Sequence, residues 1–202
     1  MLVIDYKIKN NKVIETKFYD GTVLNLSTDI FVKYGIYKDK EISDKQFFDL
    51  KLENDKQIAF LSVIKWLNYG YRCEKEVKQY LQQKKIDENI QNYVLEKVKE
   101  LGFINDENLA KIYIESNKNK FGKNKIEQKL YEKGINKTII NDCLKEYESQ
   151  DELCYNLALK KIKSKEITRE NLIKVSNFLI RNGFNYEQVK YAIKKIKNCE
   201  IE

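Results

Sequence analysis

Apolar residues recur along this chain at a fixed interval of 49 positions. A constant period of this size is typical of proteins built from stacked repeats. The columns are Val77, Ile126 and Val175; Leu81, Leu130 and Leu179; Ile86, Ile135 and Phe184; Leu95, Leu144 and Ile193; Val98, Tyr147 and Ile196; Leu61, Ala110 and Leu159; and Ile64, Tyr113 and Ile162. We therefore expect three similar units that bury these side chains against one another.

Each unit is predicted to contain three helices. Apolar residues four positions apart share one face of a helix, as Ile126 and Leu130 do in the second unit. The expected helices span residues 59–68, 74–84 and 88–101, then 107–117, 123–133 and 137–148, then 152–163, 169–181 and 186–197. A unit of 49 residues buries little by itself, so the three should stack into an elongated, gently curved body.

Polar positions at the same interval predict where helices begin and end. Asp87, Asn136 and Asn185 form one column, and their side chains are good N-caps for the third helix of each unit. Two residues earlier stand Lys85, Gly134 and Gly183, where the second helix should end. Glycine suits that position because helices often end on a residue with left-handed backbone angles.

The first 50 or so residues have a different pattern. Residues 2–8 and 13–19 alternate between apolar and polar in the manner of strands, and Asp20-Gly21 is a strong hairpin signal before a third strand. A short helix should end at Gly35, and Ser43 with Gln46 forms a capping box for another. These features predict a small β-meander with one or two short helices.

The expected fold is therefore mostly α. Residues 1–54 should form the N-terminal β-meander module, and residues 55–103, 104–152 and 153–202 the three tandem three-helix repeats.

Composition agrees with a folded helical chain. It has no proline, and hydrophobic residues make up 42% of it, enough for a core. No two of the four cysteines have a C-x-x-C spacing, so a reducing cytosol with free thiols is expected rather than a zinc or redox site. The first residues meet a charge at Asp5, which argues against a signal peptide, and no apolar run approaches the length of a membrane span. We expect a cytoplasmic protein without membrane contact.

Positive charge is concentrated in two places. The net charge is +7, of which residues 153–202 contribute +6, and residues 118–137 form a local cluster of +5. Such clusters suit a polyanion or an acidic protein surface, although a solvated lysine-rich face explains them equally well. The candidate partner-binding or DNA-binding residues are Arg72, Lys118, Lys120, Lys123, Lys125, Lys129, Lys160, Lys161, Lys190, Lys194 and Lys197.

The layout and several local motifs resemble the RecX family. Residues 71–77 read YRCEKEV, 102–110 read GFINDENLA, 122–126 read GKNKI, and 130–135 read LYEKGI. The N-terminal module carries KYGI at residues 33–36 and KEI at residues 40–42. The resemblance covers nearly the whole chain, with two departures: Cys73 replaces the usual serine of its motif, and the third repeat has few family motifs.

This resemblance implies a regulator without a cofactor. Family members resemble groove binders that lie along the RecA filament on single-stranded DNA, bridge neighbouring protomers and limit filament activity. The expected partner is the RecA filament, with non-specific contacts to single-stranded or duplex DNA, and the protein is expected to act as a monomer. Asn105 and Asp106 form the family's most recognisable pair. Either side chain can cap the helix that begins near Glu107, and this role is favoured over direct contact with a partner.

The sequence also bears on other classes of function. No histidine or glycine-rich phosphate loop is present, so we do not expect an enzyme. The stretch from Leu130 to Leu144 also resembles a helix-turn-helix, which leaves a duplex-reading DNA-binding protein as an alternative. A scaffold without a nucleic-acid link is a third possibility. Of the aromatic residues, Trp66, Tyr113 and Tyr147 are expected to pack in the core, whereas other tyrosines, among them Tyr71, could stack on bases.

Overall fold

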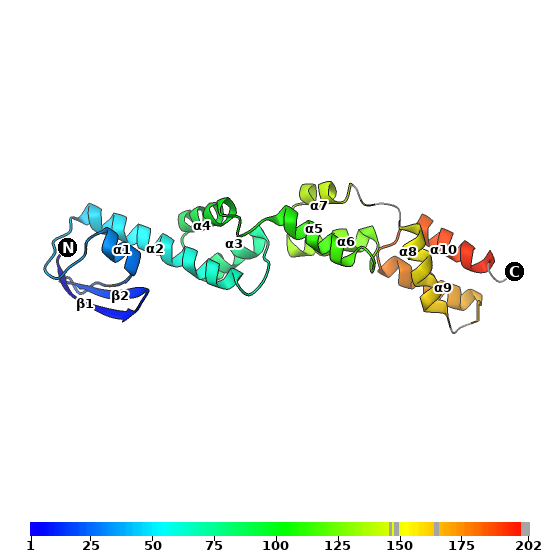
Figure 1. Ribbon diagram of the computed structural model, residues 1–202, viewed down its shortest axis with the longest axis horizontal. Coiled ribbons are helices and arrows are strands. Elements are labelled where there is room, and N and C mark those ends of the chain that lie inside the picture. Colours follow the sequence, from blue (N-terminus) through cyan, green and yellow to red (C-terminus); the bar gives the residue numbers. More distant parts are fainter. Residues whose placement is uncertain (146, 148–149, 164–165, 199–202) are drawn as a thin grey trace. The chain divides into compact units, whose positions relative to one another are not determined.

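A computed structural model describes the chain except for residues 146, 148–149, 164–165 and 199–202. Ten helices and a three-stranded sheet are present in the described part, which confirms the expected mostly helical fold with a small N-terminal sheet (Figure 1). The chain divides into two compact units. Unit 1 contains residues 1–71 and 77–103, and unit 2 contains residues 72–76 and 104–202.

The N-terminal sheet is the predicted meander. Strands β1 (Val3–Asn10), β2 (Val13–Phe18) and β3 (Val23–Ser27) are antiparallel and pair in the order β1-β2-β3. The turn between β2 and β3 is closed by the Phe18 N–H, which donates to the Thr22 carbonyl at 2.8 Å. Phe18 and Leu26 are fully buried, so one face of the sheet forms the core of this module.

Helices α1 (Thr28–Lys33) and α2 (Asp44–Leu67) cover that face of the sheet. Ser43 and Gln46 form the predicted capping box of α2. The buried Asn54 side chain accepts a hydrogen bond from the Ser27 N–H at 2.8 Å and donates one to the Asn25 carbonyl at 3.0 Å, and so ties α2 to β3.

The expected separation of a short helix from the helix at residues 59–68 was wrong, because α2 is one helix of 24 residues. The proposed boundary between residues 54 and 55 therefore falls inside a helix. The physical reason is that neither glycine nor proline interrupts this stretch.

Eight further helices follow α2 in the described part of the chain. They are α3 (Glu74–Gln83), α4 (Glu88–Glu100), α5 (Asp106–Asn117), α6 (Lys123–Lys133), α7 (Lys137–Cys143), α8 (Asp151–Ile162), α9 (Arg169–Arg181) and α10 (Tyr186–Asn198). Their bounds agree closely with the expected ones, except that α7 ends at Cys143. The rest of its expected range, up to residue 148, lies partly outside the described residues.

The predicted helix ends are confirmed. Asp87 and Asn136 accept hydrogen bonds from the N–H groups two residues ahead, and Asn185 accepts one from the Gln188 N–H. Two residues before these caps, the backbone angles are left-handed, with φ of +94° at Gly134 and +88° at Gly183. Lys85 adopts the same conformation with φ of +55°, although a side chain makes it costly there.

The 49-residue register holds for the second helix of each repeat. All six residues of its two columns, at 77, 126 and 175 and at 81, 130 and 179, are buried, which confirms the equivalence of Leu81, Leu130 and Leu179. Ile126 and Leu130 of α6 belong to one hydrophobic cluster, and Val175 and Leu179 of α9 belong to another.

The register predicted for the first helices was wrong. Leu61 and Leu159 are 40% and 37% exposed, while Ala110 of the same column is buried. The equivalent buried pairs are Ala59 and Val63 on α2, Ala110 and Ile114 on α5, and Ala158 and Ile162 on α8. The next helix has its first buried column residue 14 positions after Val63, at Val77. The corresponding spacing is 12 positions from Ile114 to Ile126 and 13 positions from Ile162 to Val175. The connections thus differ in length, which a fixed period cannot show.

One contact recurs twice within unit 2. The Cys73 thiol donates to the Lys133 carbonyl at 2.9 Å, beside Gly134. At positions 49 residues further on, the Gly122 N–H donates to the Asn182 carbonyl at 2.8 Å, beside Gly183. In the first case the start of α3 meets the left-handed end of α6, and in the second case the start of α6 meets the left-handed end of α9. A Cβ added at Gly183 would lie 2.3 Å from the Lys125 backbone nitrogen and would collide with it, whereas a Cβ added at Gly134 would meet the flexible side chain of Lys75.

The conspicuous pair at positions 105 and 106 caps two different helices. The Asn105 side chain accepts from the Asn108 N–H at 2.8 Å and caps α5, as predicted. Asp106 instead accepts from the Glu74 N–H at 2.9 Å, at the start of α3. This carboxylate takes over part of the role of the missing hydroxyl at Cys73, so the two members of the pair act on different helices.

Candidate functional site

The lysines of α10 form the clearest unpaired basic surface among the predicted site residues. Val189, Ala192 and Ile196 are buried, and they hold α10 against α8 and α9 (Figure 1). With this face inward, the helix turns Lys190, Lys194 and Lys197 to the solvent. These three residues, spaced by four and three positions, are called the α10 lysine stripe below.

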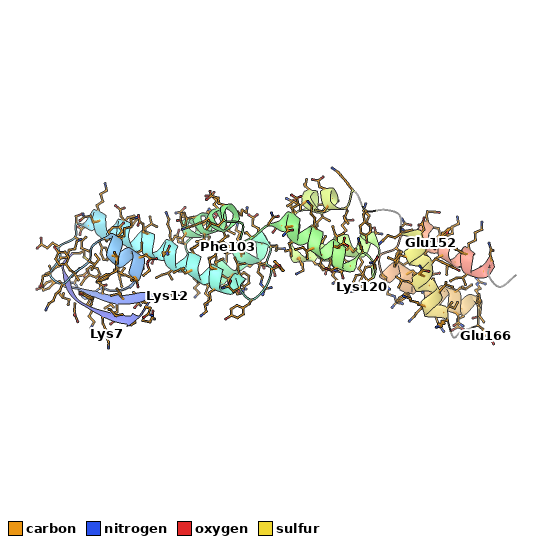
Figure 2. All side chains as sticks on the ribbon, viewed as in Figure 1. Lys7, Lys12, Phe103, Lys120, Glu152 and Glu166 are labelled. Atoms are coloured by element: carbon orange, nitrogen blue, oxygen red, sulfur yellow. The ribbon has the colours of Figure 1, made fainter. Side chains whose placement is uncertain are left out.

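A local ion pair fixes the orientation of α10. Glu152 of α8, labelled in Figure 2, accepts a hydrogen bond from Lys195 Nζ at 2.7 Å and from the Tyr191 hydroxyl at 3.2 Å. Lys195 Nζ also lies 4.3 Å from the centre of the Tyr155 ring. The hydrogen bond with Glu152 raises the pKa of Lys195, and the same bond lowers the pKa of Glu152. Lys195 therefore has a structural role, and the three lysines of the stripe take no part in this contact.

The stripe itself has no ion pair with any residue of the described chain. Its side chains are exposed, so their charges are available to a partner at little desolvation cost. Glu187 is the only acidic residue within α10. A row of three cations on one helix face is an arrangement that suits phosphate groups or a row of carboxylates.

Most of the predicted site lysines in the basic cluster at residues 118–137 make contacts within the protein. Lys123 Nζ donates to the Leu144 carbonyl at 3.2 Å, and Lys125 Nζ donates to Asn182 Oδ1 at 3.1 Å. Lys118 pairs with Glu115 at 2.7 Å and Lys129 with Glu132 at 2.8 Å. The bond between Lys129 and Glu132 raises the pKa of the former and lowers that of the latter. These four lysines therefore support the fold or neutralise nearby charges.

The remaining predicted residues are spread over the chain. Lys120, labelled in Figure 2, and Lys160 are exposed, and Lys161 Nζ lies 5.0 Å from the centre of the Phe178 ring. Arg72 is half-buried just before α3. None of these four lies on α10, so the set of predicted residues does not form one continuous site within the described parts of unit 2.

A cleft of about 780 Å³ lies beside α5 and α7 in unit 2. Its charges are matched, since Lys111 pairs with Glu107 and Lys118 with Glu115. Gln150 at its edge donates to the Lys118 carbonyl at 2.9 Å and to the Tyr147 hydroxyl at 2.6 Å. Tyr147 packs against the surrounding core as predicted, and burial raises its pKa. The cleft presents structural contacts rather than a catalytic set.

The cysteines within the described residues are free thiols. Burial raises the pKa of Cys73 and Cys143, and it raises that of Cys154 to about 12, so little reactive thiolate is expected at neutral pH. No group of three or more metal-ligating side chains occurs in the part of the chain that the structure describes. Across the same residues, no helix is both long enough and apolar enough to cross a membrane.

Models of known families match two parts of the chain. The first three-helix domain of RecX matches residues 59–97, and the second three-helix domain of RecX matches residues 105–144. Together they extend from the last part of α2 to the end of α7 and do not include α10, the helix that carries the stripe.

Relatives and solved structures agree with these matches. The regulatory protein RecX of Clostridium perfringens is 30% identical, with 98% of this chain and 97% of the relative covered. RecX of Bacillus cytotoxicus is 27% identical over 83% of this chain, which spans 64% of that relative's length. A crystal structure of a regulatory protein RecX has a TM-score of 0.74 at 22% identity, covering 96% of this chain and 98% of its own. Another, from Lactobacillus salivarius, has a TM-score of 0.66 at 28% identity, with 72% of this chain and 98% of that structure covered.

Proposed function

Because this chain belongs to the RecX family, we propose that it binds the RecA filament and limits its activity during recombination and DNA repair. Its relatives are named regulatory proteins, which fits a protein that acts by binding rather than by catalysis. A cytoplasmic monomer that needs no cofactor is part of the same proposal.

The observation that carries the proposal is the unpaired α10 lysine stripe. Three aligned cations can meet either the phosphates of single-stranded DNA or acidic side chains of a protein filament. The stripe lies on the last described helix of unit 2, where the rest of the helix is fixed by its buried face and by Glu152. Lys190, Lys194 and Lys197 are therefore the residues proposed to contact the filament.

A second function, reading of duplex DNA, is supported by α9 and α10. These helices are joined by a short turn at Asn182, Gly183 and Phe184, and α10 exposes Lys190, Lys194 and Tyr191. A helix-turn-helix protein presents its second helix to the major groove in this way. It would show a defined DNA site at which single base-pair changes cost roughly 1–3 kcal/mol.

Sedimentation with preformed RecA filaments at several salt concentrations tests the proposal. If the three lysines of the stripe meet phosphates of the single-stranded DNA, raising the salt from about 50 to 200 mM should weaken binding roughly 20-fold. The DNA alone, in single-stranded and duplex form, is the control. Binding to a particular duplex sequence with no preference for the filament would favour the helix-turn-helix function, and no binding to the filament at low salt would contradict the proposal.

A further inference from the structure

The connection between α2 and α3 exposes two tyrosine rings on unit 1. Tyr69 and Tyr71 are 75% and 74% exposed, and Gly70 separates them. Neither hydroxyl takes part in a hydrogen bond with the described residues. The equivalent connection between α5 and α6 differs, because its Phe121 is half-buried and covered by Lys125 Nζ at 4.5 Å from the ring centre. The two tyrosine rings have no such packing role.

Two more aromatic rings lie at the end of α2 and on α3, the helices that this connection joins. The Tyr69 N–H donates to the Trp66 carbonyl at 3.2 Å, so the connection begins where the last turn of α2 ends. Trp66 stacks on Tyr80 of α3, with 4.6 Å between the ring centres and 8° between the ring planes. This stacked pair joins the end of α2 to α3 within unit 1, and it confirms that Trp66 has a packing role.

Lysines flank the aromatic residues on both helices. Lys65 is exposed and precedes Tyr69 by one helical turn. Lys84 is exposed directly after the end of α3, and its Nζ lies 5.7 Å from the centre of the Tyr80 ring. Neither lysine has an ion pair with a residue of the described chain. We call the set the aromatic–lysine patch: Lys65, Trp66, Tyr69, Tyr71, Tyr80 and Lys84.

We propose that the aromatic–lysine patch binds single-stranded nucleic acid. Unpaired bases expose flat faces that stack on exposed aromatic rings, and the phosphates between them are attracted to flanking lysines. The patch offers both features, with Tyr69 and Tyr71 as stacking rings and Lys65 and Lys84 as cations. A duplex hides its base faces, and an acidic protein segment would use the lysines but not the rings. The site is separate from the α10 lysine stripe and needs no RecA.

The chain contains a single tryptophan, Trp66, which lies inside the patch and reports on binding. We expect an oligothymidylate of about 15 nucleotides to change the Trp66 fluorescence of the full chain. Tyr69→Ala and Tyr71→Ala should each weaken this binding by roughly 5- to 150-fold, which is the range for loss of one stacked base. Lys65→Ala and Lys84→Ala should reduce its salt dependence.

Matched variants separate the patch from general charge and from folding. Tyr131→Ala removes an equally exposed tyrosine from α6, and Lys78→Ala removes an exposed lysine from α3, so both should bind the oligonucleotide like the unmodified chain. Circular dichroism checks that each variant is folded. Unchanged Trp66 fluorescence with the oligonucleotide would overturn the inference, as would full binding by both tyrosine variants. Polyglutamate is the probe for an acidic protein partner. If polyglutamate changes the Trp66 fluorescence as much as the oligonucleotide does, and if the two lysine variants lose this change while the two tyrosine variants keep it, the inference is overturned in favour of such a partner.

Discussion

Gly183→Ala is expected to lower the free energy of unfolding by roughly 2–5 kcal/mol, through two separate effects. Gly183 has φ of +88°, a conformation that costs an alanine about 1–2 kcal/mol. Its new Cβ would also lie 2.3 Å from the Lys125 backbone nitrogen, and such overpacking costs about 1–3 kcal/mol. The contact that joins the start of α6 to the end of α9 should therefore open.

Two other glycines separate these effects. Gly102 has φ of +71° and no atom within 4 Å of an added Cβ, so Gly102→Ala should show only the conformational cost of about 1–2 kcal/mol. Gly122 has φ of −72° and an added Cβ would lie 2.3 Å from the Gly183 carbonyl carbon, so Gly122→Ala should show only the overpacking. Urea unfolding gives the free energies, and hydrogen exchange should locate the loosening at α6 and α9. If Gly183→Ala is no more destabilising than Gly102→Ala, the close contact is not formed.

Replacing Lys190, Lys194 and Lys197 together by glutamate should abolish filament binding at physiological salt. Each contact with a phosphate of single-stranded DNA contributes about 0.7 to the salt slope, so the loss of three contacts should lower the slope by about two. Repulsion by the introduced carboxylates adds to the loss. All three side chains are exposed, so the melting curve should change little. The dissociation constant for the filament, measured by sedimentation at several salt concentrations, tests this expectation.

A control triple has the same change in charge but lies on unit 1. Lys12, Lys38 and Lys45 are exposed residues of the N-terminal module, and their replacement by glutamate should leave most of the binding intact. Lys123, Lys125 and Lys129 make a poorer control, because their contacts with Leu144, Asn182 and Glu132 hold the fold together. If both exposed triples weaken binding equally, the effect reflects net charge, and the stripe is not the contact surface.

Local signals allowed most of the fold to be predicted. The second helices follow the 49-residue period because their core positions, such as Leu130 and Leu179, meet the same neighbours in each repeat. Caps such as Asn136 act within one turn and can be read from sequence. The first helices could not be aligned in this way, since their connections vary in length. The continuous α2 was missed because the capping box at Ser43 suggested a separate element.

The candidate site was harder to predict, because it depends on which lysines already have partners. Lys125 and Lys194 both stand on helices and look alike in the sequence. Their difference comes from tertiary contacts: Asn182 is 57 residues from Lys125 and receives its ammonium group, whereas no such acceptor meets Lys194 in the described chain. Asp106 shows the same limit, since it caps a helix that begins 32 residues earlier.

The rate of ATP hydrolysis by RecA on single-stranded DNA, with and without this protein, tests the proposed regulation most directly. We expect the unmodified chain to lower this rate at or below one molecule per RecA protomer and to hydrolyse no ATP by itself. The variant with glutamate at positions 190, 194 and 197 should leave the rate unchanged. Normal hydrolysis at saturating amounts of the unmodified, folded chain would contradict the proposal that it limits the RecA filament.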